Sequence, residues 1–391
     1  MQNFIHRTLE PKLKQVAEWY PIVSLTGPRQ SGKSTLAKHA FPDYSYITLE
    51  DPQIRAAAVE DPVSFIRNRP ERLIIDEAQY APDLFSMIQV VSDERGSTGQ
   101  YVLTGSQSFL LTESISQSLA GRVGLTTLLP LSYQELQSNM QEDYAVDDFT
   151  FAGGYPRLHS ADIPPAAYFP SYVETYIERD VAGLLDVRNK TSFRRLLEMC
   201  ALNAGALLNY SSLANDADVA PRTAKSWLSI LESSHIVFLL QPFHTNARKR
   251  LTKSPKLYFY DTGLLCYLLH ITSVKQLVNH EMFGAVFENL IISETAKRHL
   301  NNAVRPELYF YRDDSKREID LLDFTNPADK QVVEIKSSRT YHSKYARHLV
   351  GVGDELGIAQ SGRFVVARVE DSYQTKECQV LSARDWLMGT K

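Results

Sequence analysis

A glycine-rich segment near the start of the chain has the residue types and spacing of a phosphate-binding loop. It runs Gly27-Pro28-Arg29-Gln30-Ser31-Gly32-Lys33-Ser34-Thr35. The segment matches the pattern G-x-x-x-x-G-K-[ST], follows an apolar strand-like run and leads into a helical pattern. Glycines let successive backbone N–H groups surround a phosphate, and the helix N-terminus faces its charge. We therefore expect residues 27–35 to bind a nucleoside triphosphate, with Lys33 at its β- and γ-phosphates and Ser34 at Mg²⁺.

Two apolar runs further along the chain end in side chains that suit nucleotide chemistry. Residues 73–75 lead into Asp76 and Glu77. An acid pair at a strand end predicts that Asp76 binds the Mg²⁺ shell and that Glu77 orients or deprotonates an attacking water. A second run ends in Thr104 and Ser106, which could hydrogen-bond the γ-phosphate or the water as sensors, or could be simple turn residues. Together with the phosphate loop, the two acids predict hydrolysis of the bound nucleotide.

A second group of acids lies in the C-terminal third of the chain. Asp320 is in the strand-like segment REIDLLDF, and Glu334 and Lys336 are in VVEIKSS. Alternate residues of a strand point to the same side, so Glu334 and Lys336 share a side that Asp320 could face from a neighbouring strand. Two carboxylates could then hold Mg²⁺ against a phosphate while Lys336 stabilises the attacking water. The alternative is a set of solvated residues at a sheet edge.

This D…E-x-K arrangement resembles the PD-(D/E)XK nuclease superfamily. Ile319 stands where the proline of the motif would be. The resemblance implies a restriction-endonuclease-like α/β domain, and it places Glu288, in the preceding helical segment, where such nucleases often carry a further acid. Folds of this kind can keep their carboxylates while only binding nucleic acid. Cleavage and binding are therefore both open for this domain.

The pattern of apolar residues divides the chain into three regions. In residues 1–162, apolar runs alternate with amphipathic stretches, as in a parallel α/β sheet whose buried strands are PIVSLTG, YSYITLE, RLIIDEA and QYVLTGS. Residues 163–250 are mainly helical, and residues 251–391 return to α/β alternation. The Pro-rich stretch 163–170 and the basic stretch 246–256 mark the two boundaries. The sequence thus predicts an α/β protein with a helical region in its middle.

The end of the helical region resembles a winged helix-turn-helix. A short helix, a turn and a helix over Pro221–Glu232 precede a strand-like run. Arg222 and Lys225 would begin the recognition helix and could contact DNA phosphates. A basic wing or linker would follow, formed by Arg248, Lys249, Arg250, Lys253 and Lys256. Alternatively, the region serves only for packing or protein contact, because acids lie nearby that would weaken a DNA surface: Asp216, Asp218 and Glu232.

Composition limits the partners of the chain. Its 391 residues carry 42 Lys and Arg against 46 Asp and Glu, a net charge of −4, so no global attraction to nucleic acid or acidic membranes is expected. The three cysteines form no CxxC pair, which argues against a disulfide framework or structural zinc and fits a reducing cytoplasm. The sequence shows no signal peptide, no apolar run of about 18 residues and no HExxH pattern. We expect a cytoplasmic protein without a membrane partner.

Over nearly the whole chain, the order of motifs resembles a family of AAA+ ATPases of bacteria and archaea that carry a carboxy-terminal domain of unknown function. The resemblance implies a P-loop AAA+ type parallel sheet, ATP and Mg²⁺ as ligands, and a homo-oligomer whose sites are completed across subunit interfaces. It rests on GPRQSGKST (27–35), the segment Tyr46–Pro52, IIDEAQ (74–79), LTGSQS (103–108), SLAGRV (118–123), LPLSYQEL (129–136), GGYP (153–156), YIERDV (176–181), DTGLL (261–265), FENLI (287–291) and the EID (318–320) and EIK (334–336) pair.

In such oligomers an arginine of one subunit neutralises charge on the γ-phosphoryl group bound by its neighbour. Arg122 in SLAGRV is the first candidate for this role, and Arg29 and Arg179 are the others. Alternatively, Arg122 caps a helix or pairs with an acid. The sensor asparagine usual in AAA+ proteins is absent from YVLTGS, so Thr104 or Ser106 would take its place.

These patterns predict an Mg²⁺-dependent AAA+ ATPase that couples ATP binding and hydrolysis to a nuclease-like, DNA-binding carboxy-terminal module. One alternative is a nucleic-acid processing nuclease that ATP controls. The other is a slow ATP-dependent switch whose output is the binding of a protein partner.

Overall fold

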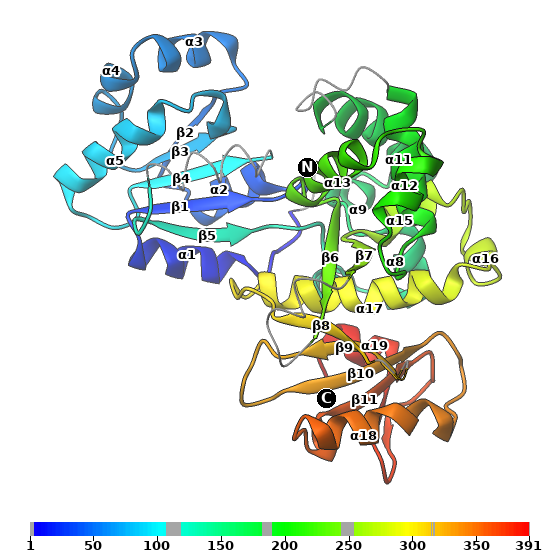
Figure 1. Ribbon diagram of the computed structural model, residues 1–391. Coiled ribbons are helices and arrows are strands. Elements are labelled where there is room, and N and C mark those ends of the chain that lie inside the picture. The colour runs from blue at the N-terminus through cyan, green and yellow to red at the C-terminus, as the bar shows by residue number, and fades with distance from the viewer. Residues whose placement is uncertain are drawn as a thin grey trace.

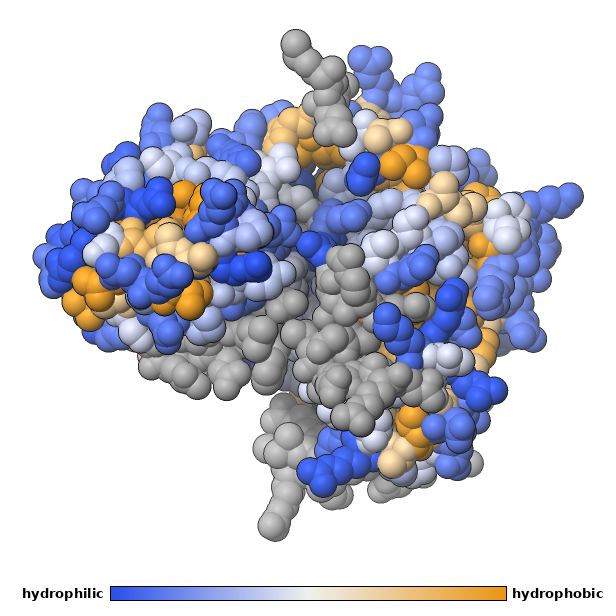
Figure 2. All heavy atoms as spheres, turned by 90° about the horizontal axis from the view of Figure 1, so that it is seen from above, coloured by the Kyte–Doolittle hydropathy of each residue, from blue (hydrophilic) through white to orange (hydrophobic). Residues whose placement is uncertain are grey.

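The computed structural model describes residues 4–106, 119–181, 190–243, 254–313, 315 and 317–390. Figure 1 shows an N-terminal α/β region beside a helical region, with a C-terminal sheet below them. In the view of Figure 2, polar residues cover most of the coloured surface, and apolar residues form small separate patches. Within the described ranges, no helix combines the length and the apolar character needed to cross a bilayer.

The N-terminal region is built on a five-stranded parallel sheet with the order β2-β3-β4-β1-β5. The strands are β1 (Ile22–Thr26), β2 (Ser45–Thr48), β3 (Leu73–Asp76), β4 (Tyr101–Gly105) and β5 (Val123–Thr127). The first four confirm the predicted strands, although β2 is half exposed because it lies at the sheet edge. The edge strand β5 was missed: its residues alternate between buried and exposed, without the continuous apolar run of a central strand.

Helices cover both faces of this sheet, which explains why its central strands are apolar throughout. α1 (Glu10–Trp19) and α2 (Lys33–Ala40) pack on the face that includes Val23 and Leu25. α3 (Pro52–Glu60), α4 (Pro62–Arg67) and α5 (Leu84–Arg95) pack on the face that includes Ile22 and Leu103. Figure 1 shows α1 and the group α3 to α5 on opposite sides of the sheet.

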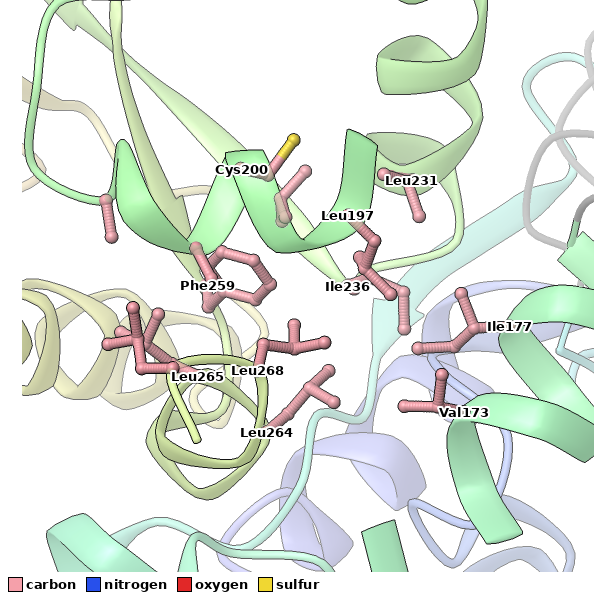
Figure 3. Close-up of a cluster of buried hydrophobic side chains, with 14 of the residues drawn as sticks. Val173, Ile177, Leu197, Cys200, Leu231, Ile236, Phe259, Leu264, Leu265 and Leu268 are labelled. Carbon is pink, nitrogen blue, oxygen red and sulfur yellow. The ribbon is translucent and has the colours of Figure 1, made fainter. Parts of the chain in front are cut away.

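The helical region gathers around one apolar cluster, part of which is drawn in Figure 3. Ile236 lies there with Ile177, Leu197 and Leu231, which come from separate helices. The elements are α8 (Val146–Ala152), α9 (Pro156–Ser160), α10 (Pro165–Tyr172), the π-helix η2 (Val173–Val181), α11 (Lys190–Leu202), α12 (Tyr210–Asp216), α13 (Pro221–Ser233), α15 (Thr262–Leu268) and α16 (Val274–Leu277). The short helix α7 (Tyr133–Asn139) packs instead on the apolar cluster of the C-terminal sheet.

An eight-stranded mixed sheet has the order β12-β13-β11-β10-β9-β8-β6-β7. β6 (Val237–Pro242) pairs with both β7 (Lys256–Phe259) and β8 (Leu308–Arg312), so this sheet runs across the predicted boundary at residue 250. The other strands are β9 (Glu318–Asp323), β10 (Gln331–Lys336), β11 (Arg363–Ala367), β12 (Tyr373–Gln374) and β13 (Gln379–Ser382). α18 (Arg347–Glu355) and α19 (Ala383–Met388) pack on this sheet.

The long helix α17 (Phe283–Leu300) joins the three regions (Figure 1). Its Glu294 accepts a hydrogen bond from the backbone N–H of Tyr133 at 2.8 Å and pairs with Lys297 at 2.7 Å. Lys297 donates to the carbonyl of Leu131 at 3.2 Å. The side chains of Glu294 and Lys297 are both buried, and each has a partner, as buried ions require. The helix therefore holds the segment after β5 against the C-terminal sheet.

Two motifs of the sequence, GGYP and DTGLL, contact each other within the helical region. Asp261, which caps α15, accepts a hydrogen bond from the N–H of Gly154 at 2.7 Å. A Cβ at Gly154 would lie 2.0 Å from the carbonyl oxygen of Leu131, so only glycine fits there. This contact between GGYP and DTGLL brings Pro156 beside Gly32 of the phosphate loop, where its Cγ would lie 3.9 Å from an added Cβ.

Candidate functional site

The glycine-rich loop connects β1 to α2 in a conformation that its sequence explains. Gly27 and Gly32 have φ angles of 146° and 96°, and a Cβ at Gly27 would lie 2.0 Å from the Leu128 carbonyl oxygen. Lys33 is buried, and its Nζ donates to the carbonyls of Gly27 at 3.0 Å and Pro28 at 2.9 Å. Burial lowers the pKa of Lys33 to about 8, although the charges of Glu77 and Asp76 act in the opposite direction.

Asp76, at the end of β3, accepts hydrogen bonds from three hydroxyl groups. Ser34 Oγ lies 2.9 Å from each of its carboxylate oxygens, and the Tyr46 hydroxyl donates at 2.7 Å. The Thr104 hydroxyl also donates to this carboxylate. A hydroxyl beside a carboxylate is the oxygen donor set that Mg²⁺ accepts, so Ser34 and Asp76 fit a magnesium ion. Sequence reasoning assigned Tyr46 no role in the site, because only the pairing of β2 with β3 brings it here.

Glu77 follows Asp76 with a positive φ of 54°, which turns its side chain away from the strand. Its Oε2 accepts hydrogen bonds from Gln79 Nε2 at 2.5 Å, from Ser106 Oγ at 2.9 Å and from Ser106 N at 3.3 Å. A carboxylate held by three donors has a fixed orientation and can orient a water molecule. Ser106 is therefore a hydrogen-bond donor to Glu77. Gln79, in the IIDEAQ motif, is the other side chain that donates to this carboxylate, and it was not identified from the sequence.

A buried arginine of the N-terminal segment, Arg7, binds the backbone of the phosphate loop. Arg7 Nη1 donates to the carbonyl of Ser31 at 2.8 Å, and Nη2 donates to the carbonyl of Leu129 at 2.7 Å. Its Nε lies 3.1 Å from Glu135 Oε1 in an ion pair whose side chains are 4% and 1% exposed. No sequence signal identified Arg7, because its partners lie 24 to 128 residues away in the chain.

Two tyrosines of the helical region form hydrogen bonds with residues of the phosphate loop. The Tyr168 hydroxyl donates to Gln30 Oε1 at 2.8 Å, and the Tyr172 hydroxyl donates to the carbonyl of Arg29 at 3.4 Å. Tyr155 and Tyr172 share a hydrogen bond of 2.7 Å. The side chain of Arg29 pairs with Glu50 at 2.9 Å. The helical region therefore closes over the phosphate loop within one chain.

A cavity of about 210 Å³ adjoins the loop at the start of α2. Leu131 and Pro156 form part of its wall, and Thr35 of the glycine-rich motif faces it. The complete lining is Phe4, Ile5, Arg7, Gly32, Thr35, Leu36, Leu131, Pro156 and Ser160.

Arg122 lies at the other end of the sheet from Lys33. Its carbonyl accepts the N–H of Ile22, the first residue of β1, whereas the glycine-rich loop follows the last. Its guanidinium pairs with Asp93 at 2.6 and 2.9 Å. Within one chain it is therefore not part of this site, and a role across a subunit interface stays a prediction. The side chain of Arg179 lies outside the described residues.

The predicted acids of the C-terminal region meet where β9 and β10 separate. The ladder between these strands ends at the pair Leu321 and Val333, and beyond it Asp320 Oδ2 accepts the N–H of Ile335 at 2.7 Å. Lys336 Nζ lies 2.7 Å from Glu334 Oε1 and 3.4 Å from Asp320 Oδ2. The predicted neighbourhood of these three charged residues is thus present in the structure.

Glu288, on α17, joins the same group. It accepts hydrogen bonds from the Tyr258 hydroxyl at 2.5 Å and from Lys256 Nζ at 3.3 Å, and Lys256 also lies 2.7 Å from Glu318. Burial and the charge of Asp320 raise the pKa of Glu288 to about 7 and that of Glu334 to about 8. Glu334 Oε2 is buried and has no hydrogen-bond partner among the residues described. An orphaned carboxylate oxygen beside two other acids suits a divalent cation.

In the described part of the chain, no three His, Cys, Asp or Glu side chains are arranged to hold a metal ion. At this cluster, lysines occupy the carboxylates that a metal ion would need. Lys336 forms ion pairs with both Asp320 and Glu334, and Lys256 forms one with Glu288. The expectation that Lys256 belongs to a basic wing or linker able to contact phosphates is wrong, since its side chain is buried among these acids. Arg248, Lys249, Arg250 and Lys253 lie outside the described residues.

The candidate recognition helix is α13, which follows α12 and leads into β6 and β7. Arg222 and Lys225 are exposed near its N-terminus. Lys225 Nζ lies 6.0 Å from the centre of the Tyr210 ring. α12, α13 and β6 follow one another along the chain as a short helix, a second helix and a strand.

Comparison with known proteins defines the class of this chain. The family model of an AAA domain matches residues 20–137, which contain the glycine-rich loop and the two acids. Two domains of unknown function follow, DUF8612 over residues 143–275 and DUF4143 over residues 283–386. The match and the parallel sheet confirm the predicted AAA-type domain of the P-loop class, and the carboxy-terminal domain of unknown function is confirmed as well.

The relatives extend this likeness beyond the first domain. An uncharacterized protein of Mycobacterium tuberculosis is 33% identical over 320 residues, which cover 81% of this chain and 70% of that protein. An uncharacterized protein of Methanocaldococcus jannaschii is 23% identical over 79% of this chain and 73% of its own length. The Walker-type ATPase of Pyrococcus abyssi is a similar solved structure, with a TM-score of 0.43 and 15% identity over 67% of this chain and 94% of that chain. The chain belongs to the same family of AAA-domain proteins as the mycobacterial relative.

Proposed function

We propose that this protein binds ATP with Mg²⁺ and hydrolyses it at the carboxyl edge of the five-stranded sheet. One observation carries the proposal: Lys33, Asp76, Glu77, Thr104 and Ser106 meet at the ends of three adjacent strands, β3, β4 and β1. Ligands of open parallel sheets bind at this edge, and the N-terminus of α2 favours negative charge there.

Each residue has a role in this proposal. Lys33 would exchange the carbonyls of Gly27 and Pro28 for the β- and γ-phosphates, and residues 27–35 would surround the β-phosphate with N–H groups. Ser34 and Asp76 would hold Mg²⁺, which when bound neutralises phosphate charge. Glu77, oriented by Gln79 and Ser106, would position the attacking water. Thr104 would keep Asp76 in place as a sensor.

The cavity beside Thr35 supports a site for the nucleobase. It adjoins the end of the glycine-rich motif and combines apolar walls, such as Leu36 and Leu131, with the polar Ser160. Base pockets of this kind are mostly apolar with a few polar groups that fix orientation.

Lys33→Ala should weaken ATP binding by about 100-fold or more, because two charge-assisted hydrogen bonds to phosphate would be lost. The measurement is ATP affinity by calorimetry. Lys14→Ala, which removes an exposed lysine of α1, is the control and should bind like the wild type. Equal affinity in the wild type and Lys33→Ala would show that the loop does not bind the phosphates.

The acid cluster favours a second candidate function, a nuclease-like domain that acts on nucleic acid. Asp320, Glu334 and Glu288 supply carboxylates around the orphaned Oε2 of Glu334, and Lys336 lies among them. These carboxylates would hold Mg²⁺, which when bound would supply charge neutralisation at a phosphate. Lys336 would then hold the attacking water. The order of α12, α13, β6 and β7 supports DNA contact through Arg222 and Lys225 of a winged helix-turn-helix.

Plasmid DNA incubated with the protein, ATP and Mg²⁺ or Mn²⁺ should be cleaved, and Lys336→Ala should remove the cleavage. Because protons compete with the metal for Glu288 and Glu334, whose pKa values are about 7 and 8, cleavage should increase between pH 6 and pH 9. Lys330→Ala is the matched control, because it removes an exposed lysine immediately before β10. Intact DNA in every lane, beside normal ATP hydrolysis, would leave this domain as a binding module. A loss of cleavage in Lys33→Ala would show that ATP controls it.

Three further expectations belong to this proposal. The protein would act in the cytoplasm as a homo-oligomer in which Arg122 of one subunit reaches the nucleotide of the next. The ATPase and helical regions would divide near residue 162, and the predicted division near residue 250 would fall between β6 and β7, two strands of one sheet. The contacts of Tyr168 and Tyr172 with the loop support a link between nucleotide state and the position of the helical region, through which a protein partner could be bound.

A further inference from the structure

The helical region contributes a histidine to the neighbourhood of the phosphate loop. His235 lies between α13 and β6, and the next residue, Ile236, is anchored in the apolar cluster beside Val173 and Ile177 (Figure 3). These two residues belong to η2, which continues α10, and α10 carries the tyrosines that contact Gln30 and Arg29. His235 is therefore held by the same packing that closes the helical region over the loop.

The backbone of His235 has an uncommon conformation. Its φ angle is 55°, a left-handed conformation uncommon for a residue with a side chain. The N–H of His235 bonds to the carbonyl of Glu232 at 3.0 Å, and the carbonyl of Ile236 accepts the N–H of Tyr260 at 3.1 Å. The imidazole lies 6.1 Å from the Tyr260 ring at an interplanar angle of 68°. These contacts fix the position of the ring.

The Nε2 atom of His235 is buried and has no hydrogen-bond partner in the part of the chain that the structure describes. A buried polar nitrogen without a partner costs free energy, so such an atom calls for an explanation. Burial and, to a smaller extent, the positive charge of Lys33 together lower the pKa of His235 to about 4, so the imidazole is neutral. His235 therefore lies within electrostatic reach of Lys33, whose Nζ bonds to the carbonyls of Gly27 and Pro28 in the loop.

We propose that His235 binds the β- or γ-phosphate of the nucleotide from the side opposite the loop, through its Nε2 atom. The inference rests on the proposed nucleotide binding at Lys33. A phosphate oxygen near Lys33 gives the orphaned nitrogen a partner, and an anion favours the imidazole as a donor. The nucleotide then bridges β1 and α2 to the α13–β6 junction, so its phosphates hold the helical region in place.

The test compares affinities for ATP, ADP and AMP by calorimetry in the wild type and His235→Asn. Asparagine accepts the left-handed backbone, so this change keeps the local fold. The matched control is His270→Asn, because His270 has a φ of 56° and lines a separate cavity with Phe151 and Tyr267. We expect His235→Asn to weaken ATP and ADP binding by about 10- to 100-fold and AMP binding by less than about twofold. His270→Asn should change none of the three affinities.

A second readout follows the histidine itself in the wild-type protein, and the variant serves only to assign its signal. In wild-type protein with labelled histidines, ADP should shift the Nε2 resonance that is absent from the His235→Asn spectrum. Unchanged ATP and ADP affinities in His235→Asn, an equal loss for all three nucleotides, or an unshifted resonance would each overturn the inference while leaving nucleotide binding intact. A wild-type protein that binds none of the nucleotides would instead refute the proposed function, and the inference with it.

Discussion

Glu77→Gln should reduce ATP turnover by about 100-fold or more while ATP affinity stays within about threefold of the wild type. General base catalysis by a positioned carboxylate contributes roughly 10²- to 10⁴-fold, and an amide cannot take a proton from water. Glutamine has the shape of glutamate, so the contacts of Lys33, Ser34 and Asp76 should remain. Its amide would, however, replace an acceptor that now serves Gln79 and Ser106 with a group that also donates.

Steady-state hydrolysis and nucleotide affinity, measured on the same preparations, check this prediction. Glu71→Gln is the matched control, because Glu71 is an exposed glutamate just before β3 and accepts a bond from Ser97. It should hydrolyse ATP like the wild type. Turnover in Glu77→Gln within about tenfold of the wild-type rate would remove Glu77 from the catalytic machinery.

Arg7→Met should lower the free energy of unfolding by about 3 to 5 kcal/mol, because it leaves the carboxylate of Glu135 buried without its ionic partner. Although burial raises the pKa of Glu135, the charge and hydrogen bonds of Arg7, with the backbone N–H groups of Ser132 and Thr8, keep it below its ordinary value. The variant should also bind ATP more weakly, since the carbonyl of Ser31 in the phosphate loop would lose its anchor.

Urea unfolding of Arg7→Met, Glu135→Met and the double variant checks this prediction. The double variant should be less destabilised than the sum of the single variants, because neither charge would then be left buried alone. Arg67→Met is the control: the pair of Arg67 with Glu94 is about half exposed, so its loss should cost at most about 1 kcal/mol. A cost for Arg7→Met as small as that of Arg67→Met would show that the buried pair does not stabilise the fold.

Much of the N-terminal fold could be predicted because its signals are local. The strands β1, β3 and β4 are continuous apolar runs, and Lys33, Ser34, Asp76 and Glu77 follow strand ends directly. The carboxyl ends of parallel strands share one edge, so their meeting place followed from the sequence pattern. β5 has no such run, because an edge strand exposes every second side chain.

The sequence predicted the C-terminal acids as a group, but it did not predict the lysine that is buried among them. The spacing of Glu334 and Lys336 on one strand was sufficient to place them together, and Asp320 was expected to face them. The buried Lys256 was assigned to a basic wing or linker, because nothing in its local sequence shows that β7 lies beside α17 and Glu288. A charged residue in a basic stretch is usually solvated, and only the tertiary fold supplies the acids that allow its burial.

The sequence by itself determined the residues that can do chemistry: a glycine loop with Lys33, acids at the end of a strand, and an E-x-K pair on another. These depend on spacings of a few residues, over which backbone geometry is nearly fixed. Only the tertiary structure decided what surrounds them. Arg7 and Tyr168 contact the loop across 24 and 138 residues of chain, a separation over which no local pattern constrains position and only the packing of helices and sheet does.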